Sequence, residues 1–304
     1  MSDEYHVPVL VSEVLSYLDV GRGGLFFDGT VGGGGHSEAI LRADAGTRVL
    51  GVDRDPAAVA AARARLARFG ERVELELGDY ADVAERLAEA LAGALLDLGV
   101  SSTQLEEAGR GFSFREGTPL DMRMGRSGRT AAELLNTENE EALADVFYLY
   151  GEERRSRKLA AEVIRRRKRQ PFETSDDVIA VLGHALGRRP GMKDRARIFQ
   201  ALRIAVNDEL ASLDRALPAL RDDLAPAGVL VVIAYHSLED RRVKLAFREW
   251  SQACTCPPAL PVCVCGAVAA GETLTRRVVV PSAQELDRNP RSRSAKLRAW
   301  RKAA

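Results

Sequence analysis

The chain has 304 residues, 46% of them hydrophobic, and its 44 basic side chains balance 44 acidic ones. This composition is enough for a substantial core in one large or two smaller domains, and the zero formal charge argues against a protein that simply coats nucleic acid. No apolar run approaches the roughly 20 residues of a membrane span, and MSDEYHVPVL lacks the basic start and apolar core of a signal peptide. We therefore expect a cytoplasmic globular protein with no membrane partner.

The first hundred residues alternate between short strand-like runs and helix-forming segments. The strand-like runs are LFFD, RVLGVD, RVELEL and GALLDLGV, at residues 25–28, 48–53, 72–77 and 93–100. Between the second and third runs, an Ala/Arg-rich stretch predicts a helix that ends near Gly70. This order predicts an α/β fold, with a parallel sheet covered by helices on both faces.

A helical block follows, and the strand pattern then returns. From about residue 104 to 215 the apolar residues recur at helical spacing. The runs GVLVVIAYHS at 228–237 and RRVVVPS at 276–282 are again typical of strands. We therefore predict one sheet domain formed by residues 1–103 and 216–304, with an all-helical domain, residues 104–215, inserted into it.

A glycine-rich turn follows the first predicted strand. In DGTVGGGGHS, residues 28–37, glycine occupies five of the seven positions after Asp28. Such a turn lets a ligand lie against backbone N–H groups at a helix N-terminus, and Asp53, at the end of the second predicted strand, suits ribose hydroxyls. These features predict a site for a nucleotide-like cofactor, with a merely flexible loop as the alternative.

The order of residues in this turn distinguishes between three possible cofactors, ATP, NAD and S-adenosylmethionine. A P-loop for ATP ends in Gly-Lys-Ser/Thr, whereas this turn ends in Gly35, His36 and Ser37. The G-x-G-x-x-G fingerprint of a dinucleotide fold is not matched, which disfavours NAD. S-adenosylmethionine carries no phosphate and needs close backbone approach, an acid for its ribose and an acid near its cationic methionine end. Asp28, the glycines and Asp53 offer that set, so S-adenosylmethionine is favoured.

About ten motifs in order give the chain an end-to-end resemblance to a known family. They are HVPVLVSEVL, DGTVGGGGHS, GVDRDP, LLDLGVSSTQL, RGFSF, PLDMRM, YGEE, IFQALRIAVNDEL, YHSLEDRRVK and NPRSRSAKLR. On these motifs the chain resembles the bacterial 16S ribosomal RNA cytosine N4-methyltransferases of the MraW or RsmH type. The resemblance implies a class I S-adenosylmethionine-dependent methyltransferase domain, Rossmann-like, with an inserted helical domain. It also implies methyl transfer to N4 of a specific cytidine of 16S rRNA, in the decoding region (P site) of the small ribosomal subunit.

The resemblance also implies which residues contact the cofactor. Asp53 suits the ribose, the ring of Tyr80 suits adenine, and Asp97 ends a strand, where open α/β sheets bind ligands. The structural alternatives are that Tyr80 is an ordinary core residue and that Asp97 caps a helix. The positions that match the family's cofactor contacts are Gly34, Gly35, His36, Asp53, Tyr80, Asp97 and Gln104.

The chemistry requires a second group of residues. A cytosine N4 amine is a weak nucleophile because its lone pair is delocalised into the ring, so attack on a sulfonium methyl needs alignment and an acceptor for an N–H. Many amino-methyltransferases carry an Asp/Asn-Pro-Pro-aromatic turn after strand four, whereas this chain reads DLGVSS from Asp97, with the acid but neither prolines nor aromatic. We expect Asp97 or Asp121 to be the acceptor and His236 to contact the base or its phosphate.

Other motifs are candidates for holding the RNA. A flipped or single-stranded base needs stacking and edge contacts, for which the candidates are Phe112, Phe114, Asp121, Arg123, Tyr235, His236 and Ser237. Residues 151–170 hold nine Lys or Arg against three Glu, and phosphate contacts of this kind supply affinity rather than sequence choice. A solvated helix face is the alternative. The candidate phosphate contacts are the basic residues of segment 154–169, with Arg165, Arg166 and Arg167 among them, and Arg195, Arg197, Arg291, Arg293, Lys296 and Arg298.

The four cysteines all lie within CTCPPALPVCVC, at Cys254, Cys256, Cys263 and Cys265. Such clustering does not match the disulfide framework of a secreted domain. A zinc ion held by four thiolates is one interpretation, but single-residue spacers are less common in such sites than two-residue spacers. Reduced thiols or an oxidation-prone loop are therefore favoured, and no metal site is firmly predicted.

The resemblance implies 16S rRNA as the partner. The neutral total charge favours docking on an assembled particle, here the 30S subunit, over scavenging naked RNA. The oligomeric state stays open, a homodimer included. An amino-methyltransferase acting on another nucleic acid, such as DNA, is disfavoured by the missing Pro-Pro-aromatic turn. A non-catalytic RNA-binding factor for ribosome assembly would not need Asp53 and Asp97 beside a cofactor turn, and the glycine order disfavours a nucleotide-dependent oxidoreductase.

Overall fold

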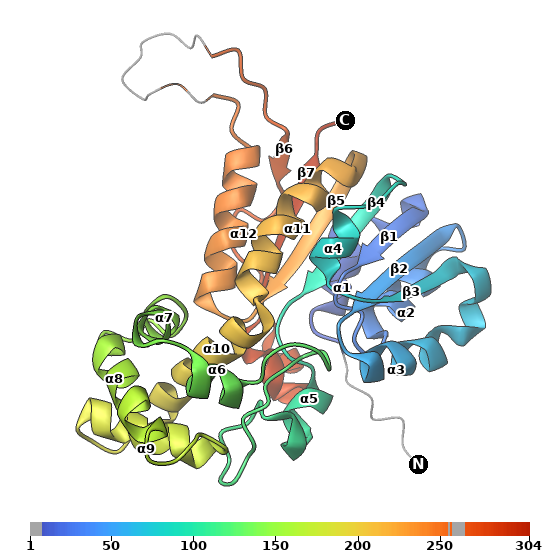
Figure 1. Ribbon diagram of the computed structural model, residues 1–304. Helices are drawn as coiled ribbons and strands as arrows, with labels where there is room; N and C mark the ends of the chain where they lie inside the picture. The colour runs from blue at the N-terminus through green and yellow to red at the C-terminus, as the bar shows by residue number, and fades with distance from the viewer. Residues whose placement is uncertain (1–7, 255, 257–264) are drawn as a thin grey trace. The chain divides into compact units, whose positions relative to one another are not determined.

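The computed structural model describes residues 8–254, 256 and 265–304 (Figure 1). The chain divides into two compact units: unit 1 is Met1–Gly99 with Ala211–Ala304, and unit 2 is Val100–Leu210. The boundaries expected from the sequence, after residues 103 and 215, lie four and five residues further along the chain than these divisions, which follow residues 99 and 210. Among the helices that the structure describes, none is long and apolar enough to cross a membrane.

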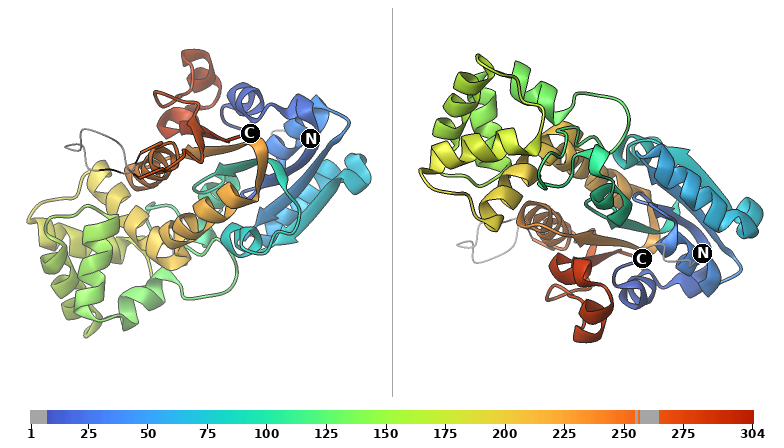
Figure 2. Two further views of the ribbon diagram at one scale, coloured as in Figure 1. Left: turned by 90° about the horizontal axis from the view of Figure 1, so that it is seen from above. Right: turned by 90° about the horizontal axis from the view of Figure 1, so that it is seen from below.

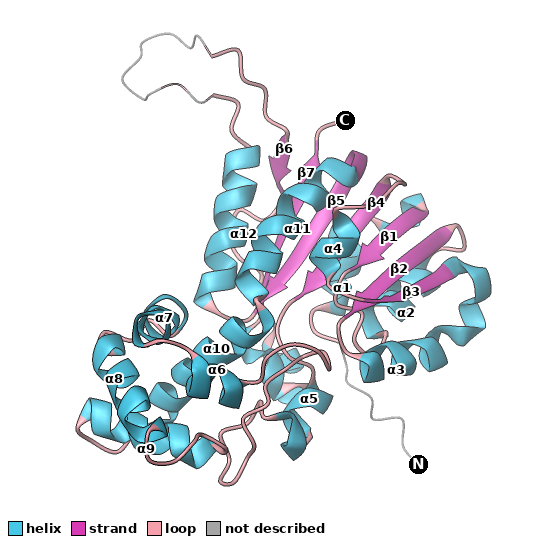
Figure 3. Ribbon diagram, viewed as in Figure 1, coloured by secondary structure: helices cyan, strands magenta, loops and turns pink. Residues whose placement is uncertain are grey.

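Unit 1 is built on a seven-stranded sheet with the order β3-β2-β1-β4-β5-β7-β6 (Figure 3). Strands β1 to β5 pair in parallel, and β7 runs antiparallel to both β5 and β6. The strand order reverses between β1 and β4, and open α/β sheets bind ligands beyond the carboxyl ends of the strands at such a point. The strands are β1 Gly24–Asp28, β2 Thr47–Asp53, β3 Val73–Leu77, β4 Leu91–Asp97, β5 Leu224–Ala234, β6 Gly271–Thr273 and β7 Lys296–Lys302.

Helices cover both faces of this sheet. One apolar cluster joins α1, α2 and α3 to one face, and a second joins α4, α11 and α12 to the other. In Figure 2, α1 and α11 accordingly lie on opposite sides of the strands. The helical segments are α1 Val11–Leu18, η1 Val20–Arg22, α2 Gly35–Ala43, α3 Pro56–Leu66, η2 Ala67–Arg72, α4 Tyr80–Ala84, α11 Glu209–Asp223, α12 Ser237–Trp250, α13 Ala283–Arg288 and η5 Pro290–Ser294.

Strand β5 shows why the sequence pattern predicts a sheet buried on both faces. Leu230 and Val232 belong to one apolar cluster, whereas Val231 and Ile233 belong to the other. Since successive side chains of a strand point to opposite faces, both faces need apolar residues and the strand reads as a continuous apolar run. The predicted parallel α/β fold is therefore confirmed.

One predicted strand is wrong. Residues 276–282 form no strand, and within them Val279 makes only an isolated bridge to Leu297. The last long strand is instead β7, Lys296–Lys302, which lies in the basic segment predicted to contact phosphates. Among its basic residues, β7 carries the buried side chains Leu297 and Trp300.

Unit 2 is helical apart from a β-bridge between Pro119 and Thr174 in its described residues. Its core has large side chains such as Phe147, Phe172 and Ile198. Three helices of 12 to 16 residues, α8, α9 and α10, form much of this core and match the helical spacing of the sequence. The helical segments are α5 Ser102–Glu106, η3 Ala108–Arg110, α6 Ala131–Thr137, α7 Glu140–Asp145, η4 Val146–Tyr150 (a π-helix), α8 Ser156–Arg167, α9 Ser175–Leu186 and α10 Met192–Asn207.

Candidate functional site

Polar side chains gather where the parallel strands of unit 1 end. Asp28, Asp53 and Asp97 are the last residues of β1, β2 and β4, and Tyr235 directly follows β5. Because these strands are parallel, their carboxyl ends share one edge of the sheet. This edge is the candidate site of unit 1.

The glycine turn between β1 and α2 has several causes. A Cβ on Gly29 would lie 2.5 Å from Leu96 Cδ2, and a Cβ on Gly35 would lie 3.0 Å from Pro8 Cγ. Gly34 caps α2 with φ +80°, in the left-handed region that favours glycine. A Cβ on Gly32 would meet nothing closer than 3.8 Å, but its φ of +51° also lies in the left-handed region. Packing and backbone conformation thus explain several of these glycines, so close approach of a ligand is not the sole explanation of the motif.

Asp28 is used inside the fold. Its side chain is buried, and its Oδ2 accepts a 2.6 Å hydrogen bond from Ser37 Oγ while its Oδ1 accepts one of 3.3 Å from the Thr30 N–H. Burial raises the pKa of this carboxyl, against the lowering effect of the Ser37 hydrogen bond. Asp28 therefore joins the end of β1 to the first turn of α2 and shapes the glycine turn.

Asp53 is held by backbone groups on both carboxylate oxygens. Its Oδ2 accepts from the Gly32 N–H at 2.9 Å and its Oδ1 accepts from the Asp55 N–H at 2.8 Å. Burial raises its pKa to about 6 despite these two hydrogen bonds. Each carboxylate oxygen has two lone-pair positions, so Asp53 keeps capacity for the two hydroxyls of a ribose.

Asp97 is the centre of a side-chain network. Tyr235 donates its phenolic O–H to Asp97 Oδ1 at 2.9 Å, and His36 Nε2 lies 3.4 Å from Asp97 Oδ2. The Asp97 N–H also donates to Thr30 Oγ1 at 2.6 Å. Burial and the neighbouring Asp97 charge raise the pKa of the Tyr235 phenol, so Tyr235 remains a proton donor. The network fixes the carboxylate while leaving 20% of the Asp97 side chain exposed.

The two buried ring nitrogens of His36 lack hydrogen bonds within the part of the chain that the structure describes. An unpartnered buried nitrogen is costly, and polar ligands commonly satisfy such groups. This feature, together with Asp53 and the N-terminus of α2, fits a polar cofactor without phosphate at this edge.

Tyr80 follows an ionic cluster that the sequence motifs did not identify. It is the first residue of α4, whose N-cap Asp79 accepts from the Ala81 N–H at 2.9 Å. Asp79 also accepts from Ser212 Oγ at 2.7 Å and pairs with Arg54. Burial alone would raise the pKa of Asp79, but these hydrogen bonds and the Arg54 charge lower it overall. A cap pattern at Asp79 is visible in the sequence, whereas its distant partner Ser212 is not.

His236 caps a helix. Its Nδ1 accepts from the Glu239 N–H at 3.3 Å, and the Glu239 carboxylate accepts from the N–H groups of Tyr235 at 2.9 Å and His236 at 3.2 Å. This capping box begins α12, in which Ser237 is the exposed first residue. The other ring nitrogen of His236, Nε2, lies 3.1 Å from Glu239 Oε1. Nε2 is buried and has no hydrogen-bond partner among the described residues, so the cap engages the ring through Nδ1 alone.

The other predicted residues belong to unit 2 and make contacts there. Gln104 is buried and accepts from the Ser101 N–H at 3.0 Å. Asp121 accepts two hydrogen bonds of 2.8 Å from the guanidinium of Arg123, which lowers the Asp121 pKa although burial acts to raise it. Phe112 is buried, and the Cζ atom of the Arg110 guanidinium lies 6.0 Å from the centre of the Phe112 ring. Each of these side chains therefore has a structural partner.

The basic helix α8 divides into structural and exposed cations. Arg166 pairs with Asp177 and lies 5.3 Å above the Phe172 ring. Arg165 is 57% exposed, although it pairs with Glu162 on the same helix.

The structure brings together the unit 1 residues of the prediction, and it places Gln104, Phe112, Asp121, Arg123, Arg165 and Arg166 in unit 2.

The sheet order of unit 1, with an antiparallel β7 and acids at the ends of β1, β2 and β4, is that of a class I S-adenosylmethionine-dependent methyltransferase. The model of the MraW methylase family matches residues 3–303, so the chain belongs to the MraW methylase family. S-adenosylmethionine is accordingly its methyl donor. These findings confirm the predicted class of fold, cofactor and family.

Curated relatives match over nearly their whole length. A ribosomal RNA small subunit methyltransferase H from Gemmatimonas aurantiaca is 52% identical, covering 98% of this chain and 96% of the relative. Proteins of the same name from Heliobacterium mobile and Geotalea uraniireducens are each 48% identical, covering 98% and 99% of this chain and 99% and 100% of the relatives.

Proposed function

We propose that the chain transfers a methyl group from S-adenosylmethionine to the exocyclic N4 of a specific cytidine of 16S rRNA, in the decoding region (P site) of the small ribosomal subunit. The relatives named ribosomal RNA small subunit methyltransferase H support small-subunit rRNA as the substrate. The hydrogen bond by which Tyr235 orients the Asp97 carboxylate supports an amine acceptor there. We place the reaction in the cytoplasm, on the 30S particle.

The unit 1 residues would hold the cofactor as follows. Asp53, with lone pairs beyond its two backbone contacts, accepts the ribose hydroxyls. His36 offers a ring nitrogen that lacks a partner among the described residues, and Tyr80 offers its ring to the adenine. Gly34 and Gly35 start α2 without a side-chain cap, which leaves room for backbone contacts. When bound, the cofactor supplies an electrophilic methyl group on a sulfonium.

Asp97 would act on the amine. Its exposed carboxylate edge accepts an N–H of the cytosine N4 group and turns the nitrogen lone pair toward the methyl. The N–C bond forms as the C–S bond breaks, and the surplus proton leaves the amine through Asp97 or water. Tyr235 is a positioning residue, because it fixes Asp97 and does not itself contact the amine in this scheme.

Contacts within the fold weigh against Asp121 as the acceptor, because Arg123 occupies its carboxylate. The Nδ1 atom of His236 caps α12, which leaves Nε2 for the base or its phosphate. We therefore propose Asp97 as the acceptor and keep His236, Phe112, Arg123, Arg165, Arg166 and Ser237 as candidate RNA contacts.

The test is transfer of a labelled methyl group to unmodified 30S subunits and, separately, to naked 16S rRNA, followed by mass identification of the modified nucleoside. We expect N4-methylcytidine at a single position and faster transfer to the particle. Label on another base, or on another nucleic acid in preference, would contradict the proposed substrate. Cofactor binding without transfer to either RNA would instead favour a ribosome-assembly factor.

A further inference from the structure

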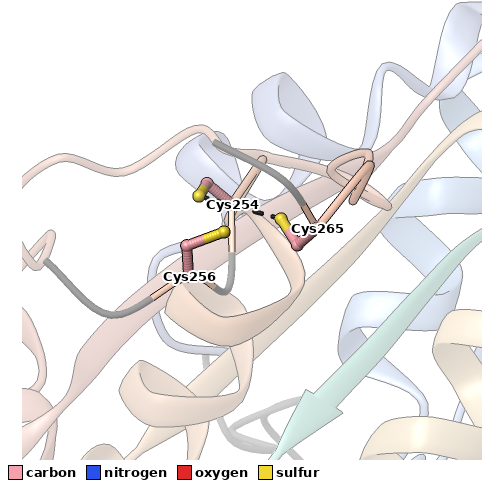
Figure 4. Close-up of side chains that lie close together, drawn as sticks. All are labelled: Cys254, Cys256 and Cys265. Atoms are coloured by element: carbon pink, nitrogen blue, oxygen red, sulfur yellow. Dashed lines mark hydrogen bonds between the residues drawn. The ribbon is translucent and has the colours of Figure 1, made fainter. Parts of the chain in front are cut away.

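Three cysteine side chains converge after α12. The sulfur atoms of Cys254, Cys256 and Cys265 all lie within 4.8 Å of one another, and Cys265 Sγ is 3.8 Å from Cys254 Sγ (Figure 4). Cys263, the fourth cysteine of the sequence, lies outside the described residues. The arrangement therefore joins thiols from both sides of residues 257–264.

The separation of the Cys254 and Cys265 sulfurs matches a metal centre better than a disulfide. A disulfide requires about 2.05 Å between sulfurs, well below the 3.8 Å seen here. Zinc–thiolate bonds of about 2.3 Å in tetrahedral directions place neighbouring sulfurs about 3.8 Å apart. The Cys254–Cys265 separation therefore equals one edge of such a tetrahedron, and the Cys256 sulfur lies within 4.8 Å of both.

The environment of these thiols also points to a ligand. Cys254 and Cys265 are exposed and Cys256 is half-buried, whereas cysteines without a ligand or bridge are usually among the most buried residues. No apolar core therefore explains why three of them gather at this surface. Thiolates select soft or borderline cations such as Zn²⁺ over Mg²⁺ or Ca²⁺.

We propose that Cys254, Cys256 and Cys265 bind one Zn²⁺ ion as thiolates, at a structural site separate from the methyl-transfer residues. Each thiol releases its proton on binding, so the step needs no oxidant or reductant. The ion would link the segment that follows α12 to the segment that precedes β6. These two segments are already joined by a hydrogen bond of 2.9 Å from the Ala270 N–H to the Trp250 carbonyl. The fourth ligand is a further thiolate or a solvent oxygen.

The first test is the metal content of full-length protein purified under reducing conditions, dialysed and measured by elemental analysis. We expect one zinc ion per chain in the native protein and in Ala253→Ser, a control that adds a serine to the same exposed stretch. Cys254→Ser, Cys256→Ser and Cys265→Ser should each lose the ion. Retention of zinc in all three variants would overturn the site, as would native protein that stays metal-free after incubation with zinc.

A second measurement avoids any dependence on how the variants fold. Native protein exchanged with Co²⁺ should show thiolate-to-cobalt charge transfer and the visible bands of tetrahedral cobalt. Octahedral spectra without charge transfer would contradict the proposal. Cys263→Ser then identifies the fourth ligand, since loss of the tetrahedral bands assigns it to that thiolate and their retention assigns it to solvent.

Discussion

Asp53 and Asp97 end β2 and β4, the strands on either side of β1, yet their carboxylate oxygens have different partners. Backbone N–H groups of Gly32 and Asp55 donate to Asp53. The carboxylate of Asp97 instead accepts from the Tyr235 hydroxyl and lies 3.4 Å from His36 Nε2. Backbone donors cannot be withdrawn by a side-chain rotation, so Asp53 is rigidly placed for binding. The Tyr235 hydroxyl that donates to Asp97 can be removed by one substitution, which allows its role to be tested.

The ionisation of Asp53 should control cofactor affinity. Burial raises its pKa to about 6, and the carboxylate must be ionised to accept from two ribose hydroxyls while it accepts from the backbone. As the pH falls through 6, the protonated fraction rises and binding weakens. With a pKa of about 6, we expect the dissociation constant for S-adenosylmethionine to be about tenfold higher at pH 5 than at pH 8. Isothermal titration calorimetry across this range measures it.

The matched control is Asp53→Asn, which removes the titrating group. Its affinity should be lower at neutral pH and nearly constant between pH 5 and 8. A native affinity that does not change across this range would show that the ionised Asp53 is not required for binding.

Asp97→Asn tests the acceptor role. The amide keeps the size and one carbonyl oxygen of the carboxylate but loses the charge that stabilises a developing ammonium. Loss of an acid–base group commonly costs 10²- to 10⁴-fold in rate, so single-turnover methyl transfer should fall by about 10²-fold or more. Cofactor affinity should change little, because Asp53 and His36 remain. A variant that instead fails to bind S-adenosylmethionine would assign Asp97 to the cofactor.

Tyr235→Phe separates positioning from chemistry. It removes the O–H that fixes Asp97 Oδ1 and leaves the carboxylate in place. We expect a smaller loss of transfer than in Asp97→Asn, with the maximal rate reduced more than the apparent affinity for RNA. An equal loss in both variants would argue that Tyr235 takes part in the chemistry itself.

Some of these residues could be located from the sequence and others could not. Asp53 and Asp97 could be located because each ends an apolar run, and strand ends share an edge in a parallel sheet. The pairing of Asp79 with Ser212 could not, because 133 residues separate them and only the folded chain brings them together. Roles that depend on side-chain partners, such as those of His236 and Asp121, were beyond sequence patterns for the same reason.

At the scale of elements, the start of α12 follows the rules of helix capping. His236 and Glu239 satisfy each other's backbone N–H groups, and Glu239 also accepts from the Tyr235 N–H. Tyr235 is the residue that orients Asp97. The cap therefore stabilises a helix start and holds the chain that carries the positioning tyrosine.

His236→Ala should weaken this helix start. Loss of an N-cap side chain costs about 1 kcal/mol in the free energy of unfolding, measured by denaturant titration. His236→Asn restores a capping oxygen, so we expect it to recover most of the stability and most of the methyl transfer. An asparagine variant of native stability with abolished transfer would contradict the structural role and return His236 to substrate contact.

The error at the C-terminal strand also has a physical cause. Residues 276–282 contain three consecutive valines, a composition typical of strands, but Val280 is 56% exposed and Pro281 follows it. In β7 the basic side chains flank Leu297, Ala299 and Trp300, all fully buried or nearly so. The basic charge there suggests RNA contact, whereas the alternation of charged and apolar residues is typical of a strand that buries apolar side chains.

At the scale of the whole molecule, most positive charge is used internally. The Arg298 guanidinium pairs with Asp240 at 2.7 Å, and Lys296 lies 3.5 Å from the same carboxylate. On α8, Arg167 donates to the Leu135 carbonyl at 3.0 Å. The net charge of zero follows from the sequence alone, but paired and exposed cations can be distinguished only in the folded chain. The proposed RNA affinity must come from the exposed subset.

That subset includes Lys158, Lys168 and Arg169 in and just beyond α8, all exposed. Replacing all three with glutamine should weaken binding of 30S subunits. It should also reduce the steepness of the salt dependence, by up to about 1 for each phosphate that is no longer neutralised. Cofactor affinity should stay unchanged, because it depends on unit 1 residues. Filter binding at several salt concentrations measures the slope.

The matched control carries the same change in charge at three exposed positions of unit 1: Arg63→Gln, Lys244→Gln and Arg248→Gln. If the α8 cations contact phosphates, only the unit 2 triple variant loses affinity and slope. Equal losses in both would mean that net charge alone attracts the RNA, since long-range attraction depends on total charge rather than on where each cation lies. An unchanged unit 2 variant would make the basic stretch a solvated helix face and leave RNA binding to other surfaces of the chain.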